Sequence, residues 1–450
     1  MVVLGIDGAR LRAEARPMLR LALPVVLGEI GWVTLGVVDV MMLGRVDAES
    51  IGALSIGRAL VMLVSIAGMG ILLGLDTVVA QAHGAGSRQE CRAWLVQGSW
   101  LALALAPLAL LACHALGLVL AEWDIDPRVR TTGIQYLAAV RWAVPPLLLY
   151  FAFRRYLQAM GLVRPILLAL VTANAINIAG NWILIHGKLG APALGAVGAA
   201  WATVGATIWL ALVLLVAILL LDRDERRAGR PVRLAPEPER LARLLRLGGP
   251  ASLHLLVEVS AISLVTTLVS RLEPAALAAH QIALNAASVT YMVPLGISSA
   301  AAVRVGHALG RGDRRGAAAA GWCAIGLGCA FMALAGVAFA VIPRTILTAF
   351  TSVPDVIRIG VPLLYLAAVF QLFDGLQVVT TGALRGAGNT RAAALAGSIA
   401  WWALAIPVGT WLCFGAGLGV VGLWAGLALG LVAAACFLIP VWSRLAKHLG

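Results

Sequence analysis

The amino-acid sequence predicts an all-α integral membrane protein that crosses the bilayer about twelve times. The first observation is composition: 61% of the 450 residues are hydrophobic and only 12% are charged, whereas soluble domains are about 45–50% apolar and about 25% charged. The second is that apolar runs long enough to cross a bilayer recur along the whole chain. The third is an internal duplication, which divides the chain into two related halves.

The expected spans are bounded by charges, prolines and glycines, and each has the ~20 apolar residues that a bilayer requires. The longest hydrophilic stretch, 222–246, is predicted to be a cytoplasmic linker. We therefore expect a six-helix bundle over 1–221 and a second over 247–450. The predicted spans are 19–43, 52–80, 94–120, 132–157, 165–187, 194–221, 247–270, 277–303, 318–342, 358–383, 393–414 and 418–442.

Basic residues are distributed unequally between the two sides that these spans define. If the N-terminus is inside, most of the 34 Lys and Arg residues fall in inside segments. The positive-inside rule then predicts that both termini and the linker are cytoplasmic. The net charge of +13 lies in short clusters between apolar runs, so we expect no nucleic-acid partner. The basic residues on the outside are Arg45, Arg128, Arg130, Lys188, Arg271, Arg344 and Arg358.

The reactive residue types form no pattern of an enzyme or a metal site. The six cysteines contain no CxxC pair and most lie in apolar runs, so neither a disulfide nor a zinc framework is expected. The seven histidines are scattered, and neither GxSxG nor HExxH occurs. We therefore expect a protein that is not an enzyme and holds no cofactor.

The duplication aligns 24–88 with 250–314 without a gap when Pro24 is placed on Pro250. Because each unit has six spans, the two copies point the same way across the membrane. The two bundles are then related by a pseudo-twofold axis along the membrane normal, and transporters of this kind bind substrate where their repeats meet. Shared residues include Gly70/Gly296, Gly84/Gly310, Gly86/Gly312 and Arg88/Arg314, and the motif LGxVG of 194–198 recurs at 418–422.

Five carboxylates lie within predicted spans, where an uncompensated charge costs at least ~2.5–3.5 kcal/mol. We interpret Asp76, near the cytoplasmic end of its span, as structural, and leave Glu29 open between a structural and a functional role. The other three, Asp39, Glu258 and Asp374, are candidate functional acids. Under the duplication Glu258 falls on Trp32 and Asp374 near Leu147, so the two halves are expected to hold different sites.

Polar neighbours favour a functional role for these three acids. Phe370, Asp374, Gln377 and Thr381 share one helical face, which suits a cavity better than lipid. Glu258 follows His254 by one turn, and the alternative there is a Glu–His pair that only fixes helix packing. In the N-terminal half, Asn174, Asn177 and Asn181 form one face of the fifth span, and such amides also tie transmembrane helices together structurally.

Several stretches resemble the multidrug and toxic compound extrusion (MATE) transporters, of the NorM-like bacterial branch. They are VVDVMMLG (37–44), RRYLQAMGLVRP (154–165), NWILIHGKLGAPALGAVGAAWAT (181–203), LAAHQIALNAASVTYMVPLGISSAAAVRVGHALG (277–310) and FDGLQVVTTGALRGAGNTR (373–391).

This resemblance implies a V-shaped pair of bundles in a bacterial inner membrane, and export of small organic cations in exchange for Na⁺ or H⁺. It places the cation-coupling or substrate acids on Asp39, Glu258 and Asp374, with Na⁺ possible at the last two. Phe370 stands where a Tyr is more usual in the family. A monomer is expected. The expected cavity-lining residues are Phe370, Gln377, Asn177, Asn181, Gln281 and Asn285.

The sequence leaves the coupling ion and the ion-binding half open. The main alternative function is a flippase or exporter of lipid-linked or other amphiphilic substrates from the same superfamily. Such proteins tend to have a cationic cavity, whereas the two intramembrane bases here, Arg58 and Arg141, lie near external span ends where they can extend to the interface. A major-facilitator transporter fits poorly, because GAGSRQECR at 84–92 lacks the loop pattern of that class.

Overall fold

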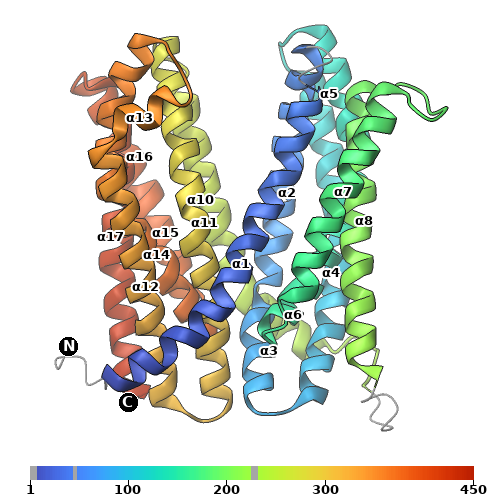
Figure 1. Ribbon diagram of the computed structural model, residues 1–450, viewed down its shortest axis with the longest axis vertical. Helices are drawn as coiled ribbons and strands as arrows, with labels where there is room; N and C mark the ends of the chain where they lie inside the picture. The colour runs from blue at the N-terminus through green and yellow to red at the C-terminus, as the bar shows by residue number, and fades with distance from the viewer. Residues whose placement is uncertain (1–7, 44–47, 224–231, 450) are drawn as a thin grey trace. The chain divides into compact units, whose positions relative to one another are not determined.

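The structure is a computed structural model, and it describes residues 8–43, 48–223 and 232–449 (Figure 1). Over these residues the regular secondary structure is entirely helical. Twelve helical stretches in the described ranges are long and apolar enough to cross a membrane, as the sequence predicts. Most of them extend beyond the predicted apolar run, as when the helix expected over 277–303 occupies Pro274–Gly310. The helices continue past their apolar runs because the helical backbone satisfies its own hydrogen bonds in either environment.

The first half of the chain supplies six spans. The second span consists of two consecutive helices, α2 and α3, and the fourth consists of α5 and α6 with a short 3₁₀ turn between them. The helices are α1 (Gly8–Leu43), α2 (Ala48–Leu72), α3 (Gly74–Gly84), α4 (Arg88–Ala121), α5 (Pro127–Val140), α6 (Val144–Ala159), α7 (Arg164–His186) and α8 (Gly195–Leu221).

The second half supplies the other six. Its eleventh span combines α15 and α16 with two π-helical segments, Ser398–Ala405 and Trp411–Gly415. The helices are α10 (Pro238–Val269), α11 (Pro274–Gly310), α12 (Arg314–Val341), α13 (Pro343–Thr348), α14 (Pro354–Gly386), α15 (Arg391–Gly397), α16 (Ile406–Thr410) and α17 (Gly419–Leu449). Because α10 begins at Pro238, the last part of the expected linker 222–246 is helical, while 224–231 lies outside the described residues.

The chain forms two compact units, here called the N-unit and the C-unit, and each contains the start of the other half's first helix. The boundary between the units crosses α1 after Val26 and α10 after Ser252. Each boundary lies two residues after a proline within the helix. The units therefore differ at their edges from the two bundles expected from the sequence. The N-unit is Leu27–His83 and Ser87–Ser252, and the C-unit is Met1–Val26, Gly84–Gly86 and Leu253–Gly450.

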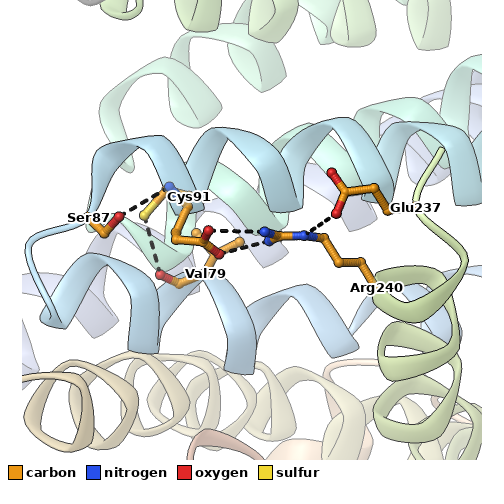
Figure 2. A network of polar contacts seen from close by, with 6 residues as sticks. Val79, Ser87, Cys91, Glu237 and Arg240 are labelled. Atoms are coloured by element: carbon orange, nitrogen blue, oxygen red, sulfur yellow. Dashed lines mark hydrogen bonds and ion pairs between the residues drawn. The ribbon is translucent and has the colours of Figure 1, made fainter. Parts of the chain in front are cut away.

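Ion pairs hold the two exchanged segments, which are the start of α1 in the C-unit and the start of α10 in the N-unit. In the C-unit, Arg304 Nη2 of α11 lies 2.6 Å from Glu14 Oε2 of α1. In the N-unit, Arg240 at the start of α10 forms a two-pronged pair with Glu90 of α4, at 2.8 and 3.0 Å (Figure 2). With the same offset of 226 residues Arg240 occupies the position of Glu14, but the partners are not equivalent, because Arg304 falls on Val78 and Glu90 falls on Gly316.

The duplication predicted from the sequence is visible in the backbone. Gly86 and Gly312 both take a left-handed conformation, with φ of 76° and 75°, which glycine adopts without steric cost. The residue after each caps the next helix: Ser87 Oγ accepts from the backbone N–H of Glu90, and Asp313 Oδ1 accepts from that of Gly316. Equivalent residues therefore begin α4 and α12 in the same way.

Glycines at equivalent positions also allow close packing of the exchanged segments. A Cβ added to Gly70 would collide with the backbone of Ser252 in the N-unit, and one added to Gly296 would collide with Val26 in the C-unit. Val26 and Ser252 are themselves equivalent under the alignment. Close backbone approach at small residues is the usual way in which transmembrane helices pack.

Candidate functional site

The five intramembrane acids differ in their partners, and two of them are neutralised by arginine. Arg154 and Arg155 lie side by side on α6 and are both buried. Arg154 forms an ion pair with Glu29, and Arg155 Nη1 lies 3.5 Å from Asp76 Oδ2. The structure thus supports the structural interpretation of Asp76 and extends it to Glu29. From the sequence we expected two intramembrane bases, Arg58 and Arg141, and the structure adds Arg154 and Arg155, which are buried in the N-unit.

Asp39 is held by uncharged donors from two other helices of the N-unit. Asn181 Nδ2 of α7 donates to Asp39 Oδ1 at 2.7 Å, and Thr203 Oγ1 of α8 donates to Oδ2 at 3.1 Å. Asn181 Nδ2 also donates to Asn177 Oδ1 at 3.2 Å. All three of Asp39, Asn177 and Asn181 are at most 5% exposed. The sequence offered Asn177 and Asn181 as cavity-lining residues without placing them beside Asp39, and nothing in it singled out Thr203.

Asn174, the third amide of the predicted face, has a different role. Its Nδ2 donates to the backbone carbonyls of Gly31 in α1, at 3.1 Å, and of Leu170 in its own helix, at 2.9 Å. These bonds join α7 to α1. Of the two interpretations that the sequence left open for the asparagine face, the structural one therefore applies to Asn174.

A positive charge lies close to Asp39. The guanidinium of Arg58, on α2, occupies the space that a Cβ on Gly36 would fill. Gly36 precedes Asp39 by three residues, and side chains at that spacing lie about 5–6 Å apart on one helix face. Arg58 also interacts electrostatically with Asp39. From the sequence we expected Arg58 to extend to the membrane interface, and the structure instead packs it against α1.

The C-unit brings Glu258 and Asp374 together. Both are less than a tenth exposed, and the Glu258 carboxylate acts electrostatically on Asp374. His254 Nε2 lies 3.9 Å from Glu258 Oε2, and the other side of its ring packs against Gly397 of α15. Among the described residues neither acid forms an ion pair with Arg or Lys. Two buried carboxylates that act on each other electrostatically therefore lie in the C-unit without an ion-paired basic residue among the described residues.

Gln377, one turn beyond Asp374, has a side-chain amide without hydrogen-bond partners among the described residues. It is fully buried, and within the described part of the chain neither its Nε2 nor its Oε1 has a hydrogen-bond partner. Thr380 Oγ1 and Thr381 Oγ1 on the same helix are also buried and unpartnered there. Leaving buried polar groups unpaired costs about 1–3 kcal/mol each. Groups of this kind on the helix that carries Asp374 are suited to bind a cation or water.

Phe370 is buried beside these residues and packs on Trp424 of α17, with ring centroids 5.5 Å apart. Trp424 Nε1 in turn donates to His280 Nδ1 at 3.0 Å, and His280 Nε2 lies 3.0 Å from Thr266 Oγ1. This chain of bonds crosses three helices of the C-unit. Sequence reasoning did not find it, because a buried histidine and a tryptophan far apart in the chain leave no local pattern.

The residues of α11 that were predicted to line a cavity have exposed side chains. Gln281, Asn285 and Ser288 lie on one face of that helix, and all three are exposed. A second exposed polar face contains Ser263 and Thr267 of α10 and Ser270, which follows its last residue. Polar side chains at membrane depth generally face protein or a water-filled cavity. The cavity role of Gln281 and Asn285 remains a prediction.

The described residues contain no group of three or more His, Cys, Asp and Glu side chains that could hold a metal ion. A Na⁺ ion at Glu258 and Asp374 would therefore need further oxygen ligands of another type. Amide and hydroxyl oxygens are suitable hard ligands, and Gln377 and Thr381 could supply them from α14.

Comparison with known proteins identifies the family. A model of the MatE family matches residues 24–183 and 250–411, one stretch in each half. The chain belongs to the MATE transporter family. This is a family of membrane transporters rather than enzymes, in agreement with the sequence prediction.

Two bacterial relatives match the MATE chain over nearly its full length. The multidrug resistance protein NorM of Photobacterium profundum is 32% identical over 434 residues, which is 95% of this chain and 94% of the relative. The multidrug resistance protein MdtK of Yersinia pseudotuberculosis is 34% identical over 436 residues, again 95% and 94%.

Solved structures show the same fold. The eukaryotic MATE transporter AtDTX14 superposes with a TM-score of 0.86 at 20% identity, over 98% of this chain and 99% of that one. An outward-facing MATE-family multidrug resistance transporter superposes with a TM-score of 0.85 at 19% identity, over 99% of both chains. The fold therefore extends over the whole MATE chain.

Proposed function

We propose that this MATE transporter exports lipophilic organic cations in exchange for Na⁺ or H⁺, and that Glu258 and Asp374 carry the exchange. The observation that carries the proposal is the contrast among the five intramembrane acids. Glu29 and Asp76 are neutralised by arginines. Glu258 and Asp374 lie together with no such partner among the described residues. The names of the relatives, multidrug resistance proteins, agree with this substrate class.

The chemistry follows from the energetics of buried charge. A carboxylate in a low-dielectric site is stable when it is protonated or when a cation lies beside it. When the coupling ion leaves Glu258 and Asp374, the negative charge that remains attracts another cation. A lipophilic cation satisfies that charge and also gains from contact with apolar walls. Drug and coupling ion thus compete for the same acids, and this competition links their opposite fluxes.

Neighbouring residues contribute to selectivity in this mechanism. The Phe370 ring can attract a cation by ~0.5–2 kcal/mol, although it lacks the hydroxyl of a Tyr. Gln377 supplies an oxygen for a small ion or a hydrogen bond to a drug. Asp39 is the candidate acid of the N-unit, and its neighbour Arg58 makes it a weaker attractor of cations than the C-unit pair. The basic ends of the helices and both termini face the cytoplasm in this proposal.

The deciding experiment measures ethidium efflux from proteoliposomes under an imposed ion gradient. Glu258→Gln and Asp374→Asn should each reduce efflux to the level of protein-free liposomes, because each removes the negative charge that drug and ion share. Asp355→Asn is the matched control, since Asp355 lies on the same helix as Asp374 but pairs with Arg358 at the surface. Efflux that persists in both C-unit variants, at normal reconstituted amounts, would refute the proposal.

A further inference from the structure

A groove on the N-unit is unrelated to the acids described above. It lies between α4 and α8, near the end of the unit where α4 begins and α8 ends, and has a volume of about 560 Å³. Specific small-molecule sites have volumes of about 300–1,000 Å³. Its walls are mainly apolar and include Leu95, Trp100 and Leu103 of α4 and Leu215 and Leu219 of α8.

One wall of the groove is formed by the segment before α10. Val232 and Leu234 line the groove, and Trp100 Nε1 donates to the Leu234 carbonyl at 2.7 Å. Gln97, which is fully buried, donates to the carbonyl of Ala235 at 3.0 Å and accepts from the N–H of Glu237 at 2.8 Å. The segment 232–237, here called the strap, is therefore bound along α4 by its backbone.

The strap is fixed further at the start of α10. Arg240 bridges Glu90 of α4 and Glu237 of the strap, the latter at 2.7 Å (Figure 2). The guanidinium groups of Arg240 and Arg243 lie 4.9 and 5.6 Å from the ring centroid of Trp94. On that side the wall of the groove is therefore held in place by hydrogen bonds, ion pairs and cation–π contacts.

The groove has one charged end. Arg92 Nε and Asp222 Oδ2 line it and lie 3.1 Å apart, each side chain about a tenth exposed. Arg223 follows Asp222 directly, and Arg233 lies between the two strap residues that line the groove. Both are exposed. Asp222 balances Arg92, so among the described residues at this end the unbalanced positive charge comes from Arg223 and Arg233, which flank the lining residues Asp222, Val232 and Leu234.

The rest of the groove belongs to the apolar surface of a membrane span. Leu103, Leu215 and Leu219 are 48%, 36% and 40% exposed, as expected for side chains that contact lipid. Apolar cavities are unfavourable for water and bind apolar groups instead. An acyl chain suits the groove, and basic residues that flank a transmembrane helix on its cytoplasmic side attract anionic headgroups.

We propose that this groove binds one anionic phospholipid, with an acyl chain between α4 and α8 and the phosphate near Arg223 and Arg233. Bound there, the lipid fills the space between α8 and the strap and stabilises the attachment of the start of α10 to the N-unit. The site is separate from Glu258 and Asp374, so it does not depend on which cation drives transport.

The test is native mass spectrometry of the full-length protein, released from nanodiscs that contain phosphatidylglycerol and phosphatidylethanolamine in equal amounts. The expected result is one retained phosphatidylglycerol per protein. Ser99→Trp, which places an indole in the groove, should abolish retention, and Arg233→Gln should weaken it about fivefold. Leu111→Trp is the matched control, because Leu111 is an exposed residue of α4 that does not line the groove.

A second measurement keeps the proposal testable if Ser99→Trp fails to fold. Phosphatidylglycerol carrying a photoreactive group on its acyl chain should crosslink the unsubstituted protein at 95–103 and 215–219. Equal retention of both lipids, retention that Ser99→Trp leaves unchanged in a folded protein, or the absence of crosslinks at both stretches would each overturn the proposal. The last outcome would mean that the groove is filled by the chain itself.

Discussion

The guanidinium of Arg58 lies over Gly36, in the space that any larger residue at position 36 would fill. Since Gly36 is one turn from Asp39, this packing brings a fixed positive charge to the candidate acid of the N-unit. The C-unit pair has no equivalent among the described residues. The Arg58 guanidinium competes with any transported cation for the charge of Asp39. The two units are therefore expected to differ in their affinity for cations.

The first prediction concerns this pair. Arg58→Gln should lower the thermal stability of the detergent-solubilised protein, because Asp39 then loses its nearest positive charge. Asp39→Asn in the same chain should restore part of the loss, with a coupling free energy of ~0.5–3 kcal/mol, typical of neighbouring residues. Gly36→Ala should resemble Arg58→Gln because its Cβ displaces the guanidinium. Strictly additive effects of Arg58→Gln and Asp39→Asn would show that the two charges do not interact.

The second prediction concerns the buried ion pair of Glu29 and Arg154. Arg154→Met leaves a buried carboxylate without a partner, a change that typically costs ~3–5 kcal/mol of stability. The double variant Glu29→Gln/Arg154→Met should recover most of it, because no buried charge remains. Arg358→Met serves as the control, since both members of the Asp355–Arg358 pair are about 70% exposed and such pairs contribute little. If the double variant unfolds as readily as the single one, the pair is not the source of the stability.

The third prediction tests the close helix contacts at equivalent glycines. Gly70→Ala and Gly296→Ala should each destabilise the protein by ~1–3 kcal/mol, because the added methyl group must displace a neighbouring helix. Gly326→Ala should be neutral or stabilising, since nothing lies within 4 Å of a Cβ at that exposed helical position and Ala favours helix more than Gly does. Thermal unfolding of the three variants gives the comparison, and similar melting temperatures for all three would contradict it.

The fourth prediction addresses the coupling ion. In proteoliposomes given a Na⁺ gradient or a pH gradient separately, one gradient alone should drive ethidium export, and the same ion should inhibit ethidium binding competitively. Competition is required because Glu258 and Asp374 hold either the ion or the drug. Ethidium binding that is unaffected by both ions would exclude shared acids even if efflux itself were seen.

The sequence identified candidate acids but not the residues that surround them. Asp39, Glu258 and Asp374 were recognisable because a carboxylate in an apolar run is costly wherever its helix packs. Their partners were not recognisable: Asn181 and Asp39 are 142 positions apart, and Arg154 and Glu29 are 125 apart. Such pairs depend on which helices are neighbours and on how each is rotated. Composition and spacing describe only one helix at a time.

The sequence by itself determined the twelve spans, the duplication and the positions of the intramembrane acids. Each of these is a local property, set by the balance between apolar side chains and the bilayer or by residues that must begin and end helices, such as Gly86 and Gly312. Only the tertiary structure decided which acids are neutralised, that Arg58 lies beside Asp39, and that each unit contains the start of the other half's first helix. The physical reason is that a buried charge is stabilised by whatever packs against it, and that neighbour comes from a distant part of the chain.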